Sequence, residues 1–265
     1  MYIVYIFLFL IGLSIGSFSN VLIYRVPRNI SIVYPPSFCT KCEREIKWIH
    51  KLPVVSWIAL KGKCTYCNSL ISAKYPLIEI LFSIIFLSNF YFYGLENVGD
   101  EPLKLVNMCI FSFLMFNISV IDIEHLKIPN KIIIFGITLN FLFSVAISIA
   151  QADYSYLFYR FLAAFVGYLG LEIIILIFFL ITNKYAFGGG DSKIFAYVGS
   201  CLGLYGLLNT FFLSIYLCGA FCIFGLLSKK LKKSDKVPFG PFIAFSSYLI
   251  SLFWLNSQNI FFLFN

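Results

Sequence analysis

Gly188-Gly189-Gly190-Asp191 places a carboxyl group between two apolar stretches of the chain. One apolar run covers residues 157–182, and another begins at Ile194. A carboxylate at the edge of hydrocarbon is costly, so such a group usually faces a bundle interior and takes part in chemistry or ion movement. The glycines permit tight turns and the close approach of a second chain. We therefore expect a functional Asp191; the alternative is a helix N-cap in a glycine-rich turn.

The composition indicates an integral membrane protein. Hydrophobic residues make up 60% of the 265-residue chain and charged residues 12%, whereas a soluble domain has about 25% charged residues. A helix needs about 20 residues to cross a hydrocarbon core of about 30 Å. We therefore predict an all-α polytopic protein of about eight transmembrane helices. The candidate segments are 2–24, 75–93, 103–121, 132–150, 157–182, 193–209, 211–228 and 238–262, and the sixth and seventh nearly touch at Asn209 and Thr210.

The basic residues predict the orientation, because Lys and Arg favour cytoplasmic loops. With the N-terminus outside, all Lys and Arg except Lys104 and Arg160 fall in cytoplasmic segments. The acidic residues expected outside are Glu96, Asp100, Glu101 and Asp153. This topology accounts for the net charge of +8, so no nucleic acid partner is expected. The first segment is expected to be a retained helix, because its basic residues follow the apolar run.

Residues 25–74 form a sizeable soluble segment with four cysteines in two pairs. Cys39-x-x-Cys42 and Cys64-x-x-Cys67 are separated by twenty-one residues, slightly more than is usual for paired zinc knuckles. Four thiolates complete a tetrahedral metal shell and leave no open position for catalysis. Disulfides are disfavoured on the cytoplasmic side. We predict a structural Zn²⁺, with redox pairs or four reduced thiols as alternatives.

A second carboxyl group, Asp122, ends the third apolar segment. Odd-numbered segments run inward in the expected topology, so Asp122 and Asp191 should reach the same membrane boundary. Two adjacent carboxyl groups cannot both ionise comfortably, and one of them keeps its proton. The ionised member can then take a proton from water while the protonated member donates one to the substrate. This pair predicts aspartic peptide hydrolysis, which needs no cofactor.

Other polar residues lie within the apolar segments. Ser17, Ser19 and Asn20 are expected to face other helices, where hydroxyl and amide groups form interhelical hydrogen bonds. Glu79 falls in the first turns of the second segment, where it gains from the helix dipole or from a basic loop residue. Glu172 lies near the middle of the fifth segment, and we expect an interior hydrogen bond or a protonated side chain there.

The order of these motifs resembles the type IV prepilin peptidases, or leader peptidase/N-methyltransferases, which are membrane aspartyl proteases of the G-x-G-D type. The resemblance covers almost the whole chain. Besides the four cysteines and the Asp122 segment, the matching motifs are Gly16-Ser17-Phe18-Ser19-Asn20-Val21, Pro53-Val54-Val55-Ser56-Trp57, Tyr75-Pro76-Leu77-Ile78-Glu79, Gly188-Gly189-Gly190-Asp191-Ser192-Lys193 and Pro238-Phe239-Gly240-Pro241-Phe242.

The resemblance implies a catalytic pair of Asp122 and Asp191, with Gly188, Gly190 and Lys193 supporting the catalytic loop. It implies removal of short basic leaders from prepilins or pseudopilins, after a glycine, at the cytoplasmic face of the bacterial inner membrane. Many family members then methylate the new N-terminal residue with S-adenosylmethionine. The four-cysteine loop is the form associated with such bifunctional members, although no glycine-rich strand-helix fingerprint for the cofactor is present.

The resemblance also divides the chain into three regions. They are a first transmembrane helix (1–24), a cytoplasmic four-cysteine loop associated with N-methyl transfer (25–74) and a seven-helix membrane peptidase domain (75–265). The family often has Pro-Asp where this chain has Pro129-Asn130. A prepilin has a basic leader in the cytosol and an apolar helix in the membrane, so its scissile bond rests at the interface. Membrane lipid is the other expected partner, and the sequence does not define the pilin or the oligomeric state.

Two other functions compete with this one. The first is a G-x-G-D protease of another substrate class, such as a preflagellin or presenilin-like peptidase, against which the long cysteine loop argues. The second is a proton- or metal-coupled transporter. Transport sites lie near the midplane between repeated halves, whereas these aspartates are expected at one boundary and the sequence has no internal repeat.

Overall fold

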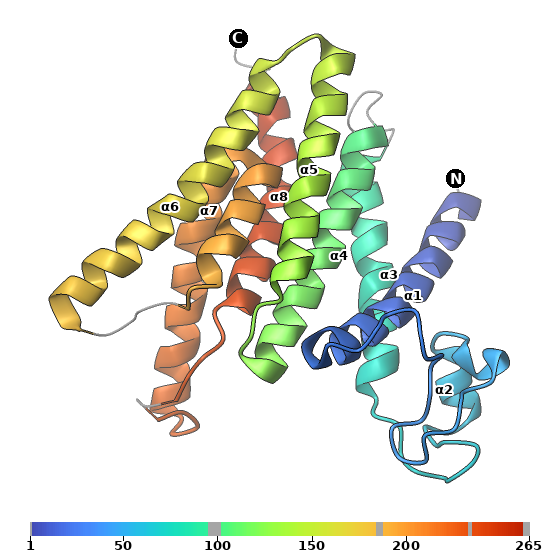
Figure 1. Cartoon of the computed structure of the whole chain (residues 1–265). Coiled ribbons are helices and arrows are strands. Elements are labelled where there is room, and N and C mark those ends of the chain that lie inside the picture. Colours follow the sequence, from blue (N-terminus) through green and yellow to red (C-terminus); the bar gives the residue numbers. More distant parts are fainter. Residues whose placement is uncertain (1, 95–101, 184–187, 233–234, 262–265) are drawn as a thin grey trace. The chain divides into compact units, whose positions relative to one another are not determined.

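A computed structural model describes residues 2–94, 102–183, 188–232 and 235–261 (Figure 1). These residues form helices, with no β-strand beyond two isolated bridges, so the all-α prediction is confirmed for them. The chain forms two compact units, residues 1–101 and 102–265. Glu96, Asp100 and Glu101, expected in an external loop, lie outside the described residues.

Two helices, α1 (Tyr2–Arg25) and α3 (Lys74–Tyr93), pack closely in the first unit. A Cβ atom added at Gly12 would lie 2.5 Å from the Cα of Ser83, and one added at Gly16 would lie 2.5 Å from the Cα of Glu79. Small residues at such crossings let helix backbones approach in a membrane. The amide of Asn20 donates to the Tyr75 carbonyl at 3.2 Å, which confirms that this polar residue faces another helix.

The segment between α1 and α3 contains three short helices, namely η1 (Val26–Arg28), η2 (Trp48–Lys51) and α2 (Val55–Ala59). Two buried charged residues on the long helices hold this segment. Arg25 donates to the carbonyls of Ser31 and Pro35 at 2.8 and 2.7 Å. Glu79 accepts the Val54 N–H at 2.7 Å, so its role is structural, as expected.

The second unit contains the longest helices. They are α4 (Pro102–His125), α5 (Asn130–Gln151), α6 (Ser155–Thr182), α7 (Asp191–Leu227) and α8 (Gly240–Phe261). Large apolar side chains fill its core, among them Phe111, Ile118, Phe195 and Ile243, each at most 1% exposed. In the described residues, six helices of the chain are long and apolar enough to cross a membrane, and α8 has a shorter apolar part. The protein is therefore a multi-pass membrane protein.

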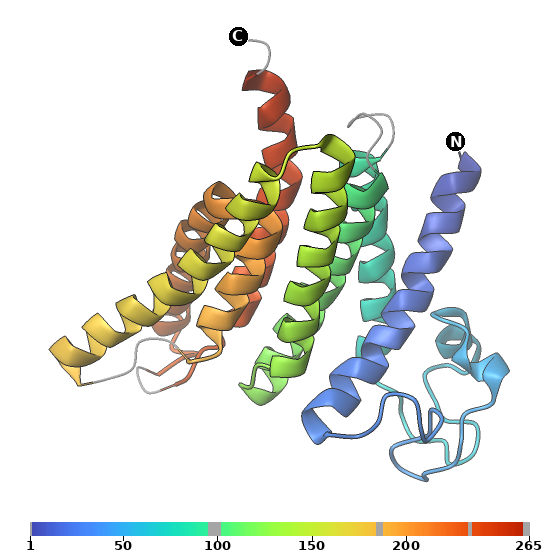
Figure 2. The same ribbon diagram turned by 45° about the horizontal axis from the view of Figure 1, so that its top comes forward.

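Helix α7 reverses direction at Gly203, where φ is 72° and ψ is −175°. The rings of Phe195 and Phe211 lie 5.7 Å apart, whereas sixteen residues of one straight helix would separate them by about 24 Å. The ribbon of α7 turns back on itself in both views (Figure 2). The predicted boundary at Asn209 and Thr210 is therefore wrong, because hydropathy does not register a reversal inside an apolar run.

The first part of α7, residues 191–202, is only about 18 Å long, which is shorter than a hydrocarbon core of about 30 Å. The predicted sixth spanning helix, 193–209, is thus replaced by a short segment and a turn. The guanidinium of Arg160 in α6 donates to the carbonyl of Cys201 at this turn. After the reversal, the second part of α7 runs back toward the end of the unit where α7 begins, at Asp191.

Candidate active site

Asp191 is the first residue of α7 and is 5% exposed. Its Oδ2 accepts the N–H of Gly188 at 2.9 Å, so the carboxylate binds the glycine-rich turn that precedes the helix. The residue in the N-cap position is Gly190. A Cβ atom at Gly190 would lie 2.7 Å from Ile128, so glycine is required there for close packing.

Asp122 lies one turn before the end of α4 and is also 5% exposed. Its Oδ2 accepts the N–H of Gly240, the first residue of α8, at 3.0 Å. A Cβ atom at Gly240 would lie 2.7 Å from this oxygen. The Pro-Phe-Gly-Pro turn therefore brings a backbone donor against Asp122, a contact that connects residues 118 positions apart in the sequence.

Both carboxyl groups belong to the second unit, and the charge of Asp122 acts on Asp191. Each group accepts a backbone N–H on one oxygen. Within the described residues, neither of the remaining oxygens has a protein hydrogen-bond donor. Two buried carboxyl groups that lie within a few ångströms of each other can share one proton, and they can then bind a water molecule or a peptide carbonyl between them.

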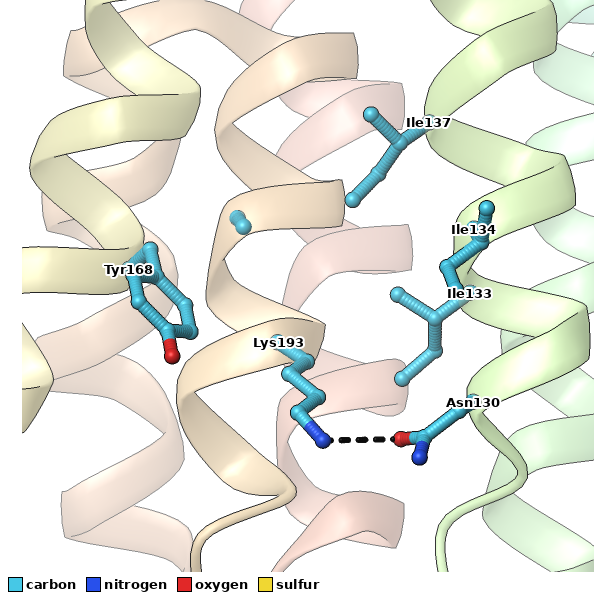
Figure 3. Close-up of a pocket in the computed structure, with 7 residues that line it drawn as sticks. Asn130, Ile133, Ile134, Ile137, Tyr168 and Lys193 are labelled. Carbon is cyan, nitrogen blue, oxygen red and sulfur yellow. Dashed lines mark hydrogen bonds between the residues drawn. The ribbon is translucent and has the colours of Figure 1, made fainter.

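Lys193 lies two residues after Asp191 and donates to Oδ1 of Asn130 at 2.9 Å. This pair lies at one end of an apolar groove of about 380 Å³ (Figure 3). The groove runs between α5, α6 and α7, and its lining residues are Asn130, Ile133, Ile134, Ile137, Tyr168, Lys193 and Ala196. An apolar segment can thus lie beside Lys193, two residues after Asp191.

Glu172 in α6 accepts a hydrogen bond from the hydroxyl of Ser192 at 2.6 Å. Ser192 is fully buried and follows Asp191 directly. The interior hydrogen bond expected for Glu172 is therefore confirmed. The sequence did not identify its partner, because the contact depends on how α6 packs against α7. Glu172 connects α6 to the first turn of the helix that carries Asp191.

The four cysteines of the first unit come together, as predicted. The sulfur atoms of Cys39, Cys42, Cys64 and Cys67 all lie within 4.8 Å of one another, and those of Cys39 and Cys67 are 3.9 Å apart. Four sulfurs at about 2.3 Å from a tetrahedral Zn²⁺ would be about 3.8 Å apart. The four cysteines can therefore bind a metal ion of this size.

The surroundings of this cluster favour the thiolate at Cys39 and Cys67 but not at Cys42: the N–H of Arg44 lowers the pKa of Cys42, whereas burial and the neighbouring thiols raise it to about 11. Burial raises the pKa of Cys39, but the N–H groups of Cys42 and Lys41 outweigh burial and lower this pKa to about 6. The hydrogen bond with Ser69 lowers the pKa of Cys67. The thiolate is the form that binds a metal, so these backbone turns prepare two of the four ligands.

Two family models match this chain. Residues 10–93 match the bacterial peptidase A24 N-terminal domain, and residues 109–223 match the type IV leader peptidase family. Proteins named prepilin leader peptidase/N-methyltransferase are similar over nearly their full length. The Bacillus subtilis protein is 33% identical, with 93% of each chain covered; the Dichelobacter nodosus protein is 29% identical, with 93% of this chain and 91% of the relative covered. No solved structure has a significant match.

Proposed function

Because the chain belongs to the type IV leader peptidase family, we propose that it removes the leader peptide of a prepilin or pseudopilin, with Asp122 and Asp191 as its catalytic pair. It is a membrane aspartic endopeptidase, and it also N-methylates the new N-terminal residue. The relatives carry both activities in their name. The observation that supports the peptidase proposal is that Asp122 and Asp191 are both buried, that each accepts one backbone N–H, and that the charge of Asp122 acts on Asp191.

The reaction proceeds with one carboxyl group ionised and the other protonated. The ionised group takes a proton from water as the water oxygen attacks the scissile carbonyl carbon, and the protonated group donates a hydrogen bond to the carbonyl oxygen. The carboxyl group that took the proton from water then gives it to the leaving nitrogen as the C–N bond breaks, so that this group is ionised again. The N–H groups of Gly188 and Gly240 hold the two carboxyl groups in position, and Gly190 allows the turn to pack against Ile128 in the segment between α4 and α5.

The substrate presents a basic leader and an apolar helix, so its scissile bond rests at the membrane boundary. The apolar groove beside Lys193 supports binding of an apolar substrate segment next to Asp191. We place this site at the cytoplasmic face of the bacterial inner membrane, with the N-terminus outside. Residues 1–24, 25–74 and 75–265 remain the proposed first helix, methyltransfer-associated loop and peptidase domain.

The proposed metal is a structural Zn²⁺ held by Cys39, Cys42, Cys64 and Cys67. Four thiolates suit Zn²⁺, and the sulfur separations agree with a tetrahedral shell. The metal stabilises the loop between α1 and α3 and takes no part in peptide hydrolysis. S-adenosylmethionine supplies the methyl group when it is bound. Membrane lipid surrounds the apolar helices, and no nucleic acid is involved.

The decisive experiment replaces each carboxyl group with its amide. Asp122→Asn and Asp191→Asn each remove one ionisable group and keep the size of the side chain. We expect leader cleavage to fall to background in both variants, because neither can share a proton between two carboxyl groups. Methyl transfer from labelled S-adenosylmethionine to an already cut pilin should continue, which would show that the protein is folded. Normal leader removal by either variant would refute the pair.

A further inference from the structure

The loop between α1 and α3 exposes a row of large apolar side chains over residues 48–58. Trp48 is 78% exposed, and Val55 and Ile58 are 61% and 63% exposed. Ile49 and Leu52 are also exposed. We call this set the 48–58 face; its members are Trp48, Ile49, Leu52, Val55 and Ile58. Several exposed large apolar side chains within one short segment are typical of a surface for a protein or a membrane.

The residues of the 48–58 face do not belong to the packed interior of the loop. A different tryptophan, Trp57, holds the loop together: its Nε1 donates to the Ile71 carbonyl at 3.1 Å. A Cβ atom added at Gly62 would lie 3.0 Å from the Trp57 ring, so that ring packs against the backbone. The loop therefore already packs one half-buried tryptophan against its own backbone, whereas Trp48 is exposed.

A hydrogen bond fixes the depth of this segment relative to α3. The N–H of Val54, directly before α2, donates to Oε2 of Glu79 at 2.7 Å. Glu79 is the sixth residue of α3, about 7 Å along the helix from Lys74. The start of α2 therefore lies beside the first turns of a membrane-crossing helix instead of beyond its end. In Figure 1, α2 is drawn beside the ends of α1 and α3 from which the loop emerges.

The charge around the 48–58 face suits an anionic surface. Residues 25–74 contain nine Lys and Arg but only two acidic residues, Glu43 and Glu45. Lys47, Lys51 and Lys61 flank the apolar side chains and are exposed, and Lys51 also forms a solvent-accessible ion pair with Glu45 at 3.8 Å. Lysines beside apolar and tryptophan side chains are typical of segments that lie in the plane of a membrane interface. Tryptophan itself is enriched at the level of the lipid headgroups.

We propose that the 48–58 face inserts into the headgroup layer of the adjoining leaflet, where anionic lipid is its partner. Trp48, Val55 and Ile58 enter the boundary between headgroups and acyl chains, and Lys47 and Lys51 bind lipid phosphates. The cysteine loop is then held at the membrane surface at a third position, besides its two connections to α1 and α3. This attachment is independent of the peptidase reaction.

Tryptophan fluorescence in lipid nanodiscs tests the proposal. The full-length protein is placed in nanodiscs whose lipids carry bromine on the acyl carbons nearest the headgroup. The Trp48→Phe variant gives the contribution of Trp48 by difference, since Trp57 and Trp254 are common to both proteins. We expect Trp48 emission to be quenched by the brominated lipid and to be little affected by iodide in the water. A Trp57→Phe variant is the matched control and should keep the lipid-quenched component.

Each other outcome overturns the proposal. Quenching of Trp48 by iodide but not by brominated lipid would show that the face points to water. Quenching by neither would show that protein covers the face, either the second unit or another copy of the chain. Quenching should also be stronger in anionic than in zwitterionic nanodiscs, and Lys47→Gln with Lys51→Gln should remove this difference. Equal quenching in both lipids would overturn the assignment of anionic lipid.

Discussion

Replacement of Gly240 by alanine should disturb the position of a catalytic carboxyl group without lowering the stability of the fold. The added Cβ would lie 2.7 Å from Oδ2 of Asp122 and 3.3 Å from its Cβ. To restore an ordinary van der Waals distance between the added Cβ and Oδ2, the carboxyl group must move by about 0.7 Å. Such a movement lengthens the hydrogen bond from the Gly240 N–H and turns Asp122 relative to Asp191.

The expected loss can be estimated from this displacement. A misplacement of about 1 Å in a reacting group can cost about 100-fold in rate. We therefore expect Gly240→Ala to lower kcat/KM for leader cleavage by about 10- to 100-fold. The same change replaces glycine by a better helix former at the start of α8, which can add up to about 1 kcal/mol of stability. Activity should thus fall although thermal stability does not.

The assay measures leader cleavage and thermal unfolding on purified full-length protein. Gly219→Ala in α7 is the matched control, since an added Cβ there meets nothing within 4 Å. The control should keep normal cleavage. Methyl transfer to an already cut pilin should be unchanged in both variants. Normal cleavage by Gly240→Ala would refute the reasoning that the Gly240 contact fixes Asp122, and an equal loss of both activities would point to general disruption.

Three further predictions concern the supporting contacts. Glu172→Ala should lower cleavage about 10-fold and thermal stability by about 1–3 kcal/mol, because it leaves the buried Ser192 hydroxyl with only its longer contact to the Gly189 carbonyl at 3.4 Å, whereas Glu172→Gln keeps an acceptor and should rescue both. Arg160→Met should lower the unfolding midpoint by removing the donor at the reversal of α7, at a cost of about 1–3 kcal/mol; an unchanged midpoint would contradict that role. Cys39→Ser should lose the zinc measured by elemental analysis, whereas Cys222→Ser in a membrane helix should keep it; zinc-free wild-type protein would refute the metal assignment.

Much of the fold follows from local sequence. The ends of α3, α5 and α6 fall within two residues of the predicted segments, because apolar runs bounded by polar residues determine them. The cysteine cluster was predictable from spacing, since each C-x-x-C turn brings two sulfur atoms together. The expectation that Asp122 and Asp191 reach one boundary needed only the alternation of helix direction.

The remaining features depend on tertiary packing. The reversal at Gly203 lies inside an apolar run, where hydropathy is the same on both sides of the turn. The contact of Ser192 with Glu172 requires a particular pairing of α6 with α7. The hydrogen bond from Gly240 to Asp122 requires α8 to begin against the end of α4. A sequence pattern can suggest that such residues are important, but it does not identify their partners.

The amide of Asn130 orients Lys193 without cancelling its charge. A carboxylate at this position would form a neutral ion pair, whereas an amide leaves a net positive charge at the rim of the groove. A substrate with one cationic end and one apolar end is repelled by this positive charge if its cationic end approaches the groove first. The positive charge at the rim thus favours entry of the apolar end into the groove, while the basic end stays in the water.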